Sequence, residues 1–325
     1  MPRIRCMMRQ LVTLANTARV VTVSPMPSIP SPPQPSCAQD YERAEAALRQ
    51  GLASLDQALV AFSAGVDSTY LLAVAHDVLG PRVQAVTADS PSLARASLRE
   101  AQAFCAARGM VHRIVATDEF ERSAYRANEG MRCYECKAAL FRAMHGLVDA
   151  VAFDGSLTGG VSLLLGAVVD DFADVRPGLR AAAEAGAQWP LVDAGFTKDM
   201  VRQASRRMGL ATWDRPAEPC LSSRFPYGET VTVEGLRMIE AAEATLRAAG
   251  LRECRVRHHA VGSGRGYLCR IEVPESDLDA VMAQRRQLLP ALRAHGYHFI
   301  SLDLAGLQSG GFNQLLQPSE VHDND

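Results

Sequence analysis

The chain has 325 residues, of which 48% are apolar, and its 34 basic and 36 acidic side chains leave a formal charge of −2. A length of this size favours two domains of about 150 residues each. The composition excludes a collagen-like chain, global disorder and a strongly cationic nucleic-acid coat. No uncharged stretch reaches the ~20 apolar residues of a membrane-spanning helix, and eight cysteines are too sparse for a secreted disulfide scaffold. We therefore expect a cytoplasmic protein with reduced thiols and no membrane partner.

Both ends of the chain are predicted to lie outside the folded part. Residues 1–39 contain four arginines, no acidic residue and a Pro/Ser-rich end, and they show no hydrophobic period. They are predicted to form a disordered tail. Residues 309–325 follow the last expected strand and are predicted to form a flexible C-terminal tail.

The first folded unit, residues 40–228, shows alternating strand and helix patterns. The run from Ala58 to Phe62 is short and apolar, which is typical of a strand buried on both faces. Further strands are expected at 83–88, 111–115 and 151–154, and helical patterns cover 40–55, 70–79, 92–108 and 137–147. This order predicts an α/β fold, in which a parallel sheet is flanked by helices on both faces.

The second folded unit, residues 229–308, is predicted to be a smaller α+β domain for substrate binding or oligomerisation. Helical patterns cover 233–249 and 275–293, and strands are expected at 254–258, 267–273 and 297–304. Period-two alternation separates Arg255 and Arg257 from Val256, and Arg270 and Glu272 from Ile271. The charged side chains form either one functional surface or an ordinary solvated sheet face.

A serine-rich turn follows the first strand. Ser63, Ala64, Gly65, Asp67 and Ser68 lie between the strand and an apolar helix, where small residues let backbone N–H groups close on phosphate oxygens. The turn resembles the SGGxDS signature of the PP-loop ATP pyrophosphatases, with Ala64 in place of one glycine. Alanine is tolerated there only if its φ angle is negative. The resemblance implies ATP binding at these residues, with Asp67 near Mg²⁺ and the pyrophosphate.

Three cysteines stand out from the other five. Cys133 and Cys136 form a Cys-x-x-Cys, which by itself is ambiguous among zinc, iron–sulfur and redox uses, and Cys220 is a third thiol far along the chain. Neither segment offers a spaced histidine or a fourth cysteine for structural zinc. Three thiolates with one open position suit a [4Fe-4S] cluster better. Three other cysteines fall at apolar positions of a helix and two strands and are expected to be buried: Cys105, Cys254 and Cys269.

The segment from Cys220 to Gly228, with Arg176-Pro177-Gly178 and its flanking acids, resembles the LarE family of PP-loop sulfur transferases. The resemblance runs from about Ala58 to Leu304 and also covers 255–257, 270–275 and 301–304. It implies an enzyme that uses ATP to adenylate the carboxylates of pyridinium-3,5-biscarboxylic acid mononucleotide and then replaces oxygen by sulfur. The product belongs to the biosynthesis of the nickel-pincer nucleotide of lactate racemase.

The resemblance also implies roles for individual residues. With Cys133, Cys136 and Cys220 all present, the chain is similar to the subgroup in which three cysteines hold a [4Fe-4S] cluster carrying the transferable sulfide, and these three are the expected catalytic thiols. Ser223, Arg224, Arg255 and Arg257 are expected to bind the substrate's phosphate and carboxylates. Arg224 and Glu272 are further expected catalytic residues, with Glu272 orienting the arginines or assisting proton transfer. The expected partners are a small nucleotide substrate and other copies of the chain in a homo-oligomer, with no nucleic acid.

One segment departs from the family pattern. In members of the family, a strand ends in Asp-Gly, Ser/Thr-Asn comes next, and a pair of acids follows soon after. Here Asp154-Gly155-Ser156 is followed by thirteen apolar or small residues, 157–169, before the acids. This reads as an insertion beside the ATP site. Two alternatives to the sulfur transferase stay open. One is a tRNA-thiolating PP-loop enzyme, which would need a broad basic face for RNA; the other is a nucleotide-binding module without catalysis.

Overall fold

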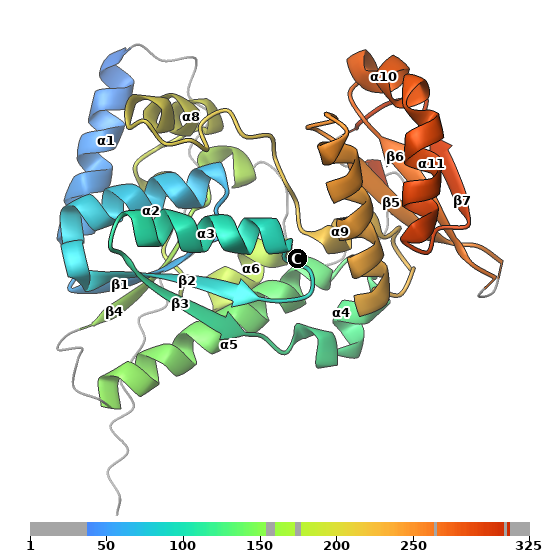
Figure 1. The fold of residues 1–325 in the computed structure, drawn as a ribbon. Helices are drawn as coiled ribbons and strands as arrows, with labels where there is room; N and C mark the ends of the chain where they lie inside the picture. The colour runs from blue at the N-terminus through green and yellow to red at the C-terminus, as the bar shows by residue number, and fades with distance from the viewer. Residues whose placement is uncertain (1–37, 154–159, 173–176, 263–264, 309–310, 313–325) are drawn as a thin grey trace, which may run out of the picture.

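The computed structural model describes residues 38–153, 160–172, 177–262, 265–308 and 311–312 (Figure 1). Residues 1–37 of the predicted tail at 1–39 and most of the predicted C-terminal tail lie outside this range. Residues 38–39 begin the first helix, so their assignment to the tail is wrong. Gly311 and Phe312 are described, and Phe312 is buried. None of the helices in the described segments is both long enough and apolar enough to span a lipid bilayer.

A four-stranded sheet forms the centre of the larger part of the molecule. Its strands are β1 (Gln57–Ala61), β2 (Val83–Asp89), β3 (Val111–Ala116) and β4 (Val161–Leu165), in the spatial order β3-β2-β1-β4, and all neighbours are parallel. Four of the five residues of β1 are buried, as expected for the apolar run. The order reverses between β1 and β4, and such a switch point opens a crevice at the carboxyl ends of the strands.

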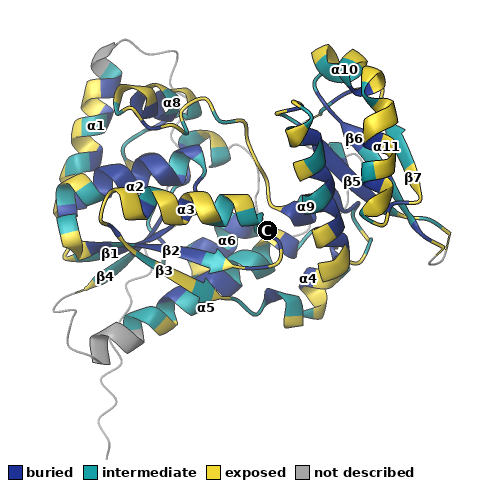
Figure 2. Cartoon of the chain, viewed as in Figure 1, coloured by how far each residue is buried: buried dark blue, intermediate teal, exposed yellow. Residues whose placement is uncertain are grey.

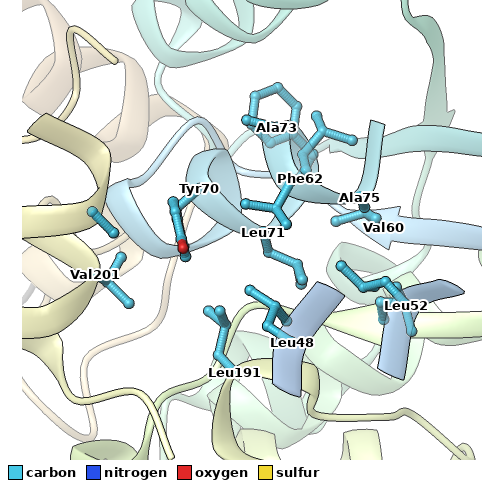
Figure 3. Close-up of a cluster of buried hydrophobic side chains, with 14 of the residues drawn as sticks. Leu48, Leu52, Val60, Phe62, Tyr70, Leu71, Ala73, Ala75, Leu191 and Val201 are labelled. Carbon is cyan, nitrogen blue, oxygen red and sulfur yellow. The ribbon is translucent and has the colours of Figure 1, made fainter. Parts of the chain in front are cut away.

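Helices cover both faces of this sheet, which confirms the predicted α/β architecture. One face packs against α1, α2, α3, α7 and α8, through side chains such as Leu48, Leu71 and Val201 (Figures 1 and 3). The other face packs against α5 and α6, through Phe141 and Ala182. Figure 2 shows α2 buried along most of its length. The bounds are α1 Ala38–Ala53, α2 Val66–Leu79, α3 Arg95–Ala107, α4 Ser123–Ala127, α5 Arg132–Phe153, α6 Pro177–Glu184, α7 Pro190–Asp193 and α8 Lys198–Arg207.

The fourth strand lies later in the chain than predicted. Residues 151–153 continue α5, and the strand is Val161–Leu165, whose Leu165 pairs with Ala61 of β1. The expected strand at 151–154 is therefore wrong where the structure describes it, and residues 161–165 of the expected insertion form a strand of the central sheet. Residues 154–159 lie outside the described residues. A three-residue apolar run can extend a helix as well as begin a strand, so the pattern alone did not separate the two.

A second, three-stranded sheet forms the smaller part of the molecule. It has the order β5-β6-β7, with β5 (Arg255–Ala260) antiparallel to β6 (Tyr267–Glu272) and β6 parallel to β7 (Phe299–Leu302). The helices α9 (Val233–Ala248) and α11 (Arg285–Ala294) contribute Leu246 and Leu292 to the core beneath it. The single helix expected at 275–293 is divided at Gln284 into α10 (Leu278–Ala283) and α11, after a short 3₁₀ turn at Glu275–Asp277.

Candidate functional site

One large cleft, with a volume of about 810 Å³, joins the two sheets. It begins where β1 and β4 end, at the switch point of the parallel sheet, where open α/β sheets bind ligands. Its walls include the first turns of α5, α6 and α8 and the chain from Arg215 to Tyr227. The far wall comes from Arg255, Arg257 and Phe312 of the smaller part. A volume of this size is in the range of small-molecule sites, roughly 300–1,000 Å³.

The serine-rich turn forms one end of the cleft and leads directly into α2. Ser68 Oγ accepts a hydrogen bond from the Ser63 N–H at 3.3 Å and donates one to Gly65 O at 3.2 Å. The Gly65 N–H donates to Ser63 Oγ at 3.4 Å. These bonds are long, so the two hydroxyls satisfy the turn's amide donors only weakly. The same donors can turn to phosphate oxygens at the positive end of α2.

Ala64 adopts a conformation that the sequence argument did not allow. Its φ angle is 58°, in the left-handed region, so the expectation of a negative φ is wrong. The conformation costs a non-glycine residue roughly 1–2 kcal/mol. The surroundings hold it in place: the alanine side chain is buried in the core beneath the turn, and Arg215 Nη1 donates to its carbonyl oxygen at 3.0 Å.

Asp67, in the first turn of α2, forms an ion pair with Lys198 at the start of α8. Burial raises the pKa of the Asp67 carboxyl, and the ammonium of Lys198 opposes this shift. The Asp67 Oδ1 atom is buried and has no hydrogen-bond partner within the described chain. A second carboxylate, Asp171, lies near enough to raise the pKa of Asp67 as well. Carboxylate oxygens beside a phosphate-binding turn are the ligands that Mg²⁺ prefers.

Gly166 lets the end of β4 approach this turn. A Cβ atom built on Gly166 would lie 2.9 Å from both Cα and N of Ser68, which is closer than side-chain carbons approach backbone. Gly166 directly follows β4, and the acids Asp170 and Asp171 lie in the 3₁₀ turn at Val169–Phe172.

The three predicted thiols meet in the cleft. Cys133 and Cys136 occupy one face of the first turns of α5, and Cys220 directly precedes a 3₁₀ turn at Leu221–Arg224. Cys133 and Cys220 are accessible from the cleft, and Cys136 is half-buried. Burial raises the pKa of the Cys136 thiol to about 12, and the nearby Cys220 adds to the shift. Burial and Cys220 also raise the pKa of Cys133.

A buried arginine lies among the thiols. Arg132 Nη1 donates to Asn128 Oδ1 at 2.5 Å and to the Ser222 carbonyl at 2.8 Å. Its positive charge opposes the rise in the pKa of Cys133, and its Nε has no hydrogen-bond partner within the described residues. The guanidinium therefore links the Cys-x-x-Cys turn to the Cys220 turn and favours negative charge on the sulfur atoms.

Buried hydroxyls fix the Cys220 turn from the other side. Ser222 Oγ is 2.7 Å from Tyr125 Oη and 2.5 Å from Ser92 Oγ, and Ser92 also contacts the Tyr125 hydroxyl. The Leu221 N–H donates to the Ser92 carbonyl at 2.9 Å. The turn after Cys220 is thus held by both its backbone and its side chains.

Arg224, expected to bind substrate, is engaged by the protein itself. Its Nε donates to Glu243 Oε1 at 2.8 Å, and the two side chains are 3% and 0% exposed. Its Nη1 donates to the Pro219 carbonyl at 2.7 Å and to Ser223 Oγ at 2.9 Å. These contacts make Arg224 a residue that positions the Cys220 turn, although one edge of it lines the cleft.

The charged face of the second sheet is buried rather than solvated. Arg257 pairs with Glu272 at 2.8 Å and donates to the Ser223 carbonyl at 2.8 Å, and its guanidinium lies 4.6 Å from the Phe312 ring centroid. Arg255 donates to the Gln308 carbonyl at 3.0 Å. Burial and the neighbouring arginines lower the pKa of Arg255. The alternative of an ordinary solvated sheet face is therefore wrong.

The other expected site residues fall into two groups. Ser223, Arg255 and Arg257 line the cleft. Glu272 is buried behind Arg257, also contacts Arg270 at 3.3 Å, and is not among the described residues that line the cleft. Its position suits orientation of the arginines better than proton transfer.

The donor groups of the cleft determine which kind of metal centre fits it. Within the described residues, no group of three or more His, Cys, Asp or Glu side chains is arranged to hold a single metal ion. In a [4Fe-4S] cluster each cysteine binds a different iron atom, so the ligands need not converge on one point. Three thiols on one cleft wall, two of them accessible, fit such a cluster better than a single ion.

Sequence reasoning missed several residues of the cleft, including Lys198, Arg132 and Gly166. Thr197 caps α8 by accepting from the Met200 N–H at 3.3 Å, and a threonine before a polar helical pattern was a usable sign that Lys198 opens a helix. No local pattern showed that the turn after β1 packs against Gly166, because the strand there was placed ten residues too early.

The geometry defines an α/β protein in which a serine-rich strand–helix turn, three thiols and several arginines, among them Arg255 and Arg257, share one cleft. No family model matches the chain. It is 41% identical over 271 residues to an uncharacterized protein of Synechocystis sp., covering 83% of this chain and 96% of that protein. It is 32% identical over 278 residues to the pyridinium-3,5-bisthiocarboxylic acid mononucleotide synthase of Lactiplantibacillus plantarum. This match covers 85% of this chain and 96% of the synthase. An uncharacterized protein of Methanocaldococcus jannaschii is 23% identical over 246 residues, which cover 76% of this chain and 88% of that protein.

The similarity to the Lactiplantibacillus plantarum synthase extends over most of both chains. The chain belongs to the family of this synthase, the LarE family.

Proposed function

We propose that the protein is an ATP-dependent sulfur transferase that acts on pyridinium-3,5-biscarboxylic acid mononucleotide in biosynthesis of the nickel-pincer nucleotide. One observation carries the proposal: the serine-rich turn and all three thiols line one cleft in a chain of the LarE family. We also propose that the first unit, residues 40–228, is a PP-loop ATP pyrophosphatase domain. The second unit, residues 229–308, supplies the substrate-binding arginines.

ATP would bind with its phosphates on the turn from Ser63 to Ser68. The amides of the turn and the positive end of α2 would stabilise the phosphate charge. Lys198 would neutralise further negative charge, and the free Oδ1 atom of Asp67 would reach the Mg²⁺ that accompanies the nucleotide. Ala64 contributes its carbonyl and its left-handed conformation rather than a side-chain contact.

The mononucleotide would bind at the opposite end of the cleft. Arg255 and Arg257 can present planar guanidinium groups to a phosphate or a carboxylate, and Ser223 can add a hydroxyl. Glu272 holds the Arg257 guanidinium, and Arg224 holds the turn that carries Cys220 and Ser223. In this arrangement Arg224 and Glu272 position groups that touch the substrate.

The chemistry needs activation because a carboxylate is a poor acyl donor. A carboxylate oxygen of the substrate attacks the α-phosphorus of ATP, the bond to the β-phosphate oxygen breaks, and magnesium pyrophosphate leaves. The acyl adenylate then loses AMP when sulfur attacks the carbonyl carbon. The phosphate-binding turn and Lys198 would hold the leaving pyrophosphate, and Asp67 would hold the Mg²⁺ that accompanies it.

Cys133, Cys136 and Cys220 would hold a [4Fe-4S] cluster, which supplies the sulfur when bound. The chain's own contribution is to keep these thiols on one wall and to place Arg132 beside them. The buried Ser92–Tyr125–Ser222 network keeps the Cys220 turn in its position.

The direct test incubates anaerobically purified protein with ATP, Mg²⁺ and the biscarboxylate mononucleotide. The proposal predicts release of pyrophosphate and a product whose mass increases by the difference between sulfur and oxygen. Cys220→Ser should still release pyrophosphate, because adenylation does not use the thiols, but should form no thiocarboxylate. Absence of pyrophosphate from the wild-type reaction would refute the proposal. Steeply salt-dependent binding of tRNA would favour the tRNA-thiolating alternative instead.

A further inference from the structure

A connecting segment, residues 211–219, runs from the end of α8 to Cys220, and we call it the strap. Arg202 of α8 holds it by donating from Nη1 to the Trp213 carbonyl at 2.9 Å and from Nη2 to the Arg215 carbonyl at 2.7 Å. The strap in turn reaches the phosphate-binding turn, because Arg215 Nη1 donates to the Ala64 carbonyl at 3.0 Å. Arg215 lines the main cleft and also a neighbouring cavity of about 630 Å³.

The Arg215 contact fixes the orientation of one peptide group. A trans peptide is planar, so the Ala64 carbonyl and the Gly65 N–H point in opposite directions. With the carbonyl held by Arg215, the Gly65 N–H points into the turn, toward Ser63 Oγ at 3.4 Å. That bond is long, and the N–H is therefore available to a phosphate oxygen.

The same contact holds a strained residue. Ala64 has a φ angle of 58°, a conformation that is strained for alanine and unstrained for glycine. If the Arg215 hydrogen bond is removed, the Ala64 carbonyl is no longer held, and Ala64 can leave this conformation by rotation about both its φ and its ψ angle. The rotation would turn the Gly65 N–H away from the phosphate-binding position, and binding would have to reverse it.

We propose that Arg215 is a positioning residue for the phosphate-binding turn: from the strap, it holds the Ala64–Gly65 peptide so that the Gly65 N–H faces the bound polyphosphate. The inference rests on the proposed ATP-dependent function. It assigns the strap a second role. Besides connecting α8 to the Cys220 turn, the strap holds the phosphate-binding turn in position.

The test compares binding of Mg-ATP, Mg-pyrophosphate and adenosine by isothermal titration calorimetry. Arg215→Met should weaken binding of ATP and of pyrophosphate about tenfold and leave adenosine unchanged. Ala64→Gly should restore most of this loss in the Arg215→Met background, because glycine adopts the left-handed conformation without help. Glu100→Gln is the matched control, since it removes the ion pair between Glu100 and Arg215 but keeps the Arg215 contact to Ala64. It should bind all three ligands like the wild type.

The outcomes separate this inference from the proposed function. A wild-type protein that binds neither ATP nor pyrophosphate would overturn the proposed function. A wild-type protein that binds both, with Arg215→Met equally strong, would overturn the inference alone. A loss in Arg215→Met that Ala64→Gly does not restore would also overturn it, because Arg215 would then act by direct contact or through the fold. If Arg215→Met changes the circular dichroism, Arg215→Gln replaces it, since it keeps a polar side chain but lacks the guanidinium that donates to the Ala64 carbonyl.

Discussion

The ion pair between Arg224 and Glu243 is the contact whose loss should affect stability most. Glu243 accepts hydrogen bonds from Arg224 at 2.8 and 3.2 Å, from Arg247 at 3.0 Å and from the Val256 N–H at 3.1 Å. Its side chain is 0% exposed and that of Arg224 is 3% exposed. Glu243→Gln keeps the shape of the side chain but leaves the Arg224 cation buried without a counter-charge.

The expected loss follows from burial rather than from distance. Removing one partner of a buried ion pair costs about 3–5 kcal/mol, because the remaining charge stays desolvated. The glutamine oxygen still accepts one hydrogen bond, so we expect Glu243→Gln to lower the free energy of unfolding by about 3 kcal/mol and Glu243→Ala by about 5 kcal/mol. The ion pair of Asp40 and Arg43 is shorter, at 2.6 Å, but its side chains are 42% and 78% exposed. Asp40→Asn is therefore the matched control, with an expected loss below about 1 kcal/mol.

Urea unfolding followed by far-ultraviolet circular dichroism measures these differences. The reasoning predicts a clear separation between Glu243→Gln and Asp40→Asn. Equal losses of less than about 1 kcal/mol in both variants would refute it, since burial would then not determine the contribution of the pair.

Three further predictions concern other parts of the molecule. Burial, with a smaller contribution from His259, lowers the pKa of His258 from 6.5 to about 4, so this side chain is neutral in the folded protein and protonates first in the unfolded chain. The free energy of unfolding should therefore fall as the pH drops from 6.5 to 4. His258→Phe should reduce that fall by up to about 1.4 kcal/mol per pH unit in acid unfolding curves. An unchanged dependence of the free energy of unfolding on pH would contradict a low pKa of His258. Gly166→Ala should lower the melting temperature, with a loss of about 1–3 kcal/mol, and weaken ATP binding, because its Cβ would lie 2.9 Å from backbone atoms of Ser68. Gly51→Ala should instead raise stability by about 0.5–1 kcal/mol, because Gly51 lies within α1 and a Cβ there meets nothing within 4 Å. A rise in stability in both glycine variants would show that Gly166, at the end of β4, does not pack closely on the phosphate-binding turn.

Much of the fold could be predicted because its local patterns are strong. The buried run 58–62 became β1, and the apolar pattern after it became α2. Cys105 and Cys269 are buried in α3 and β6, as expected for small apolar positions, and Cys254 is buried directly before β5. These features depend on short segments whose periodicity is visible in the sequence.

The errors arose where tertiary contacts decide between equal local patterns. Val151–Phe153 suits a strand and a helix equally, and pairing of Leu165 with Ala61 selects the later segment as β4. Ala64, which has a positive φ, is contacted at its carbonyl by Arg215, which lies 151 positions away in the chain. The charged face of the second sheet is covered by distant segments through Ser223, Gln308 and Phe312, which alternation within the strands cannot show.

The central claim is that three thiols from two distant segments of the chain bind one [4Fe-4S] cluster. Iron and acid-labile sulfide analysis with Mössbauer spectroscopy, after anaerobic reconstitution, tests this most directly. The account predicts a [4Fe-4S] signal in the wild type and no such signal in Cys133→Ser, Cys136→Ser or Cys220→Ser. Cys105→Ala is the control and should keep the signal, because the Cys105 thiol is buried in α3 and is not among the described residues that line the cleft. A full complement of cluster iron in Cys220→Ser would contradict it.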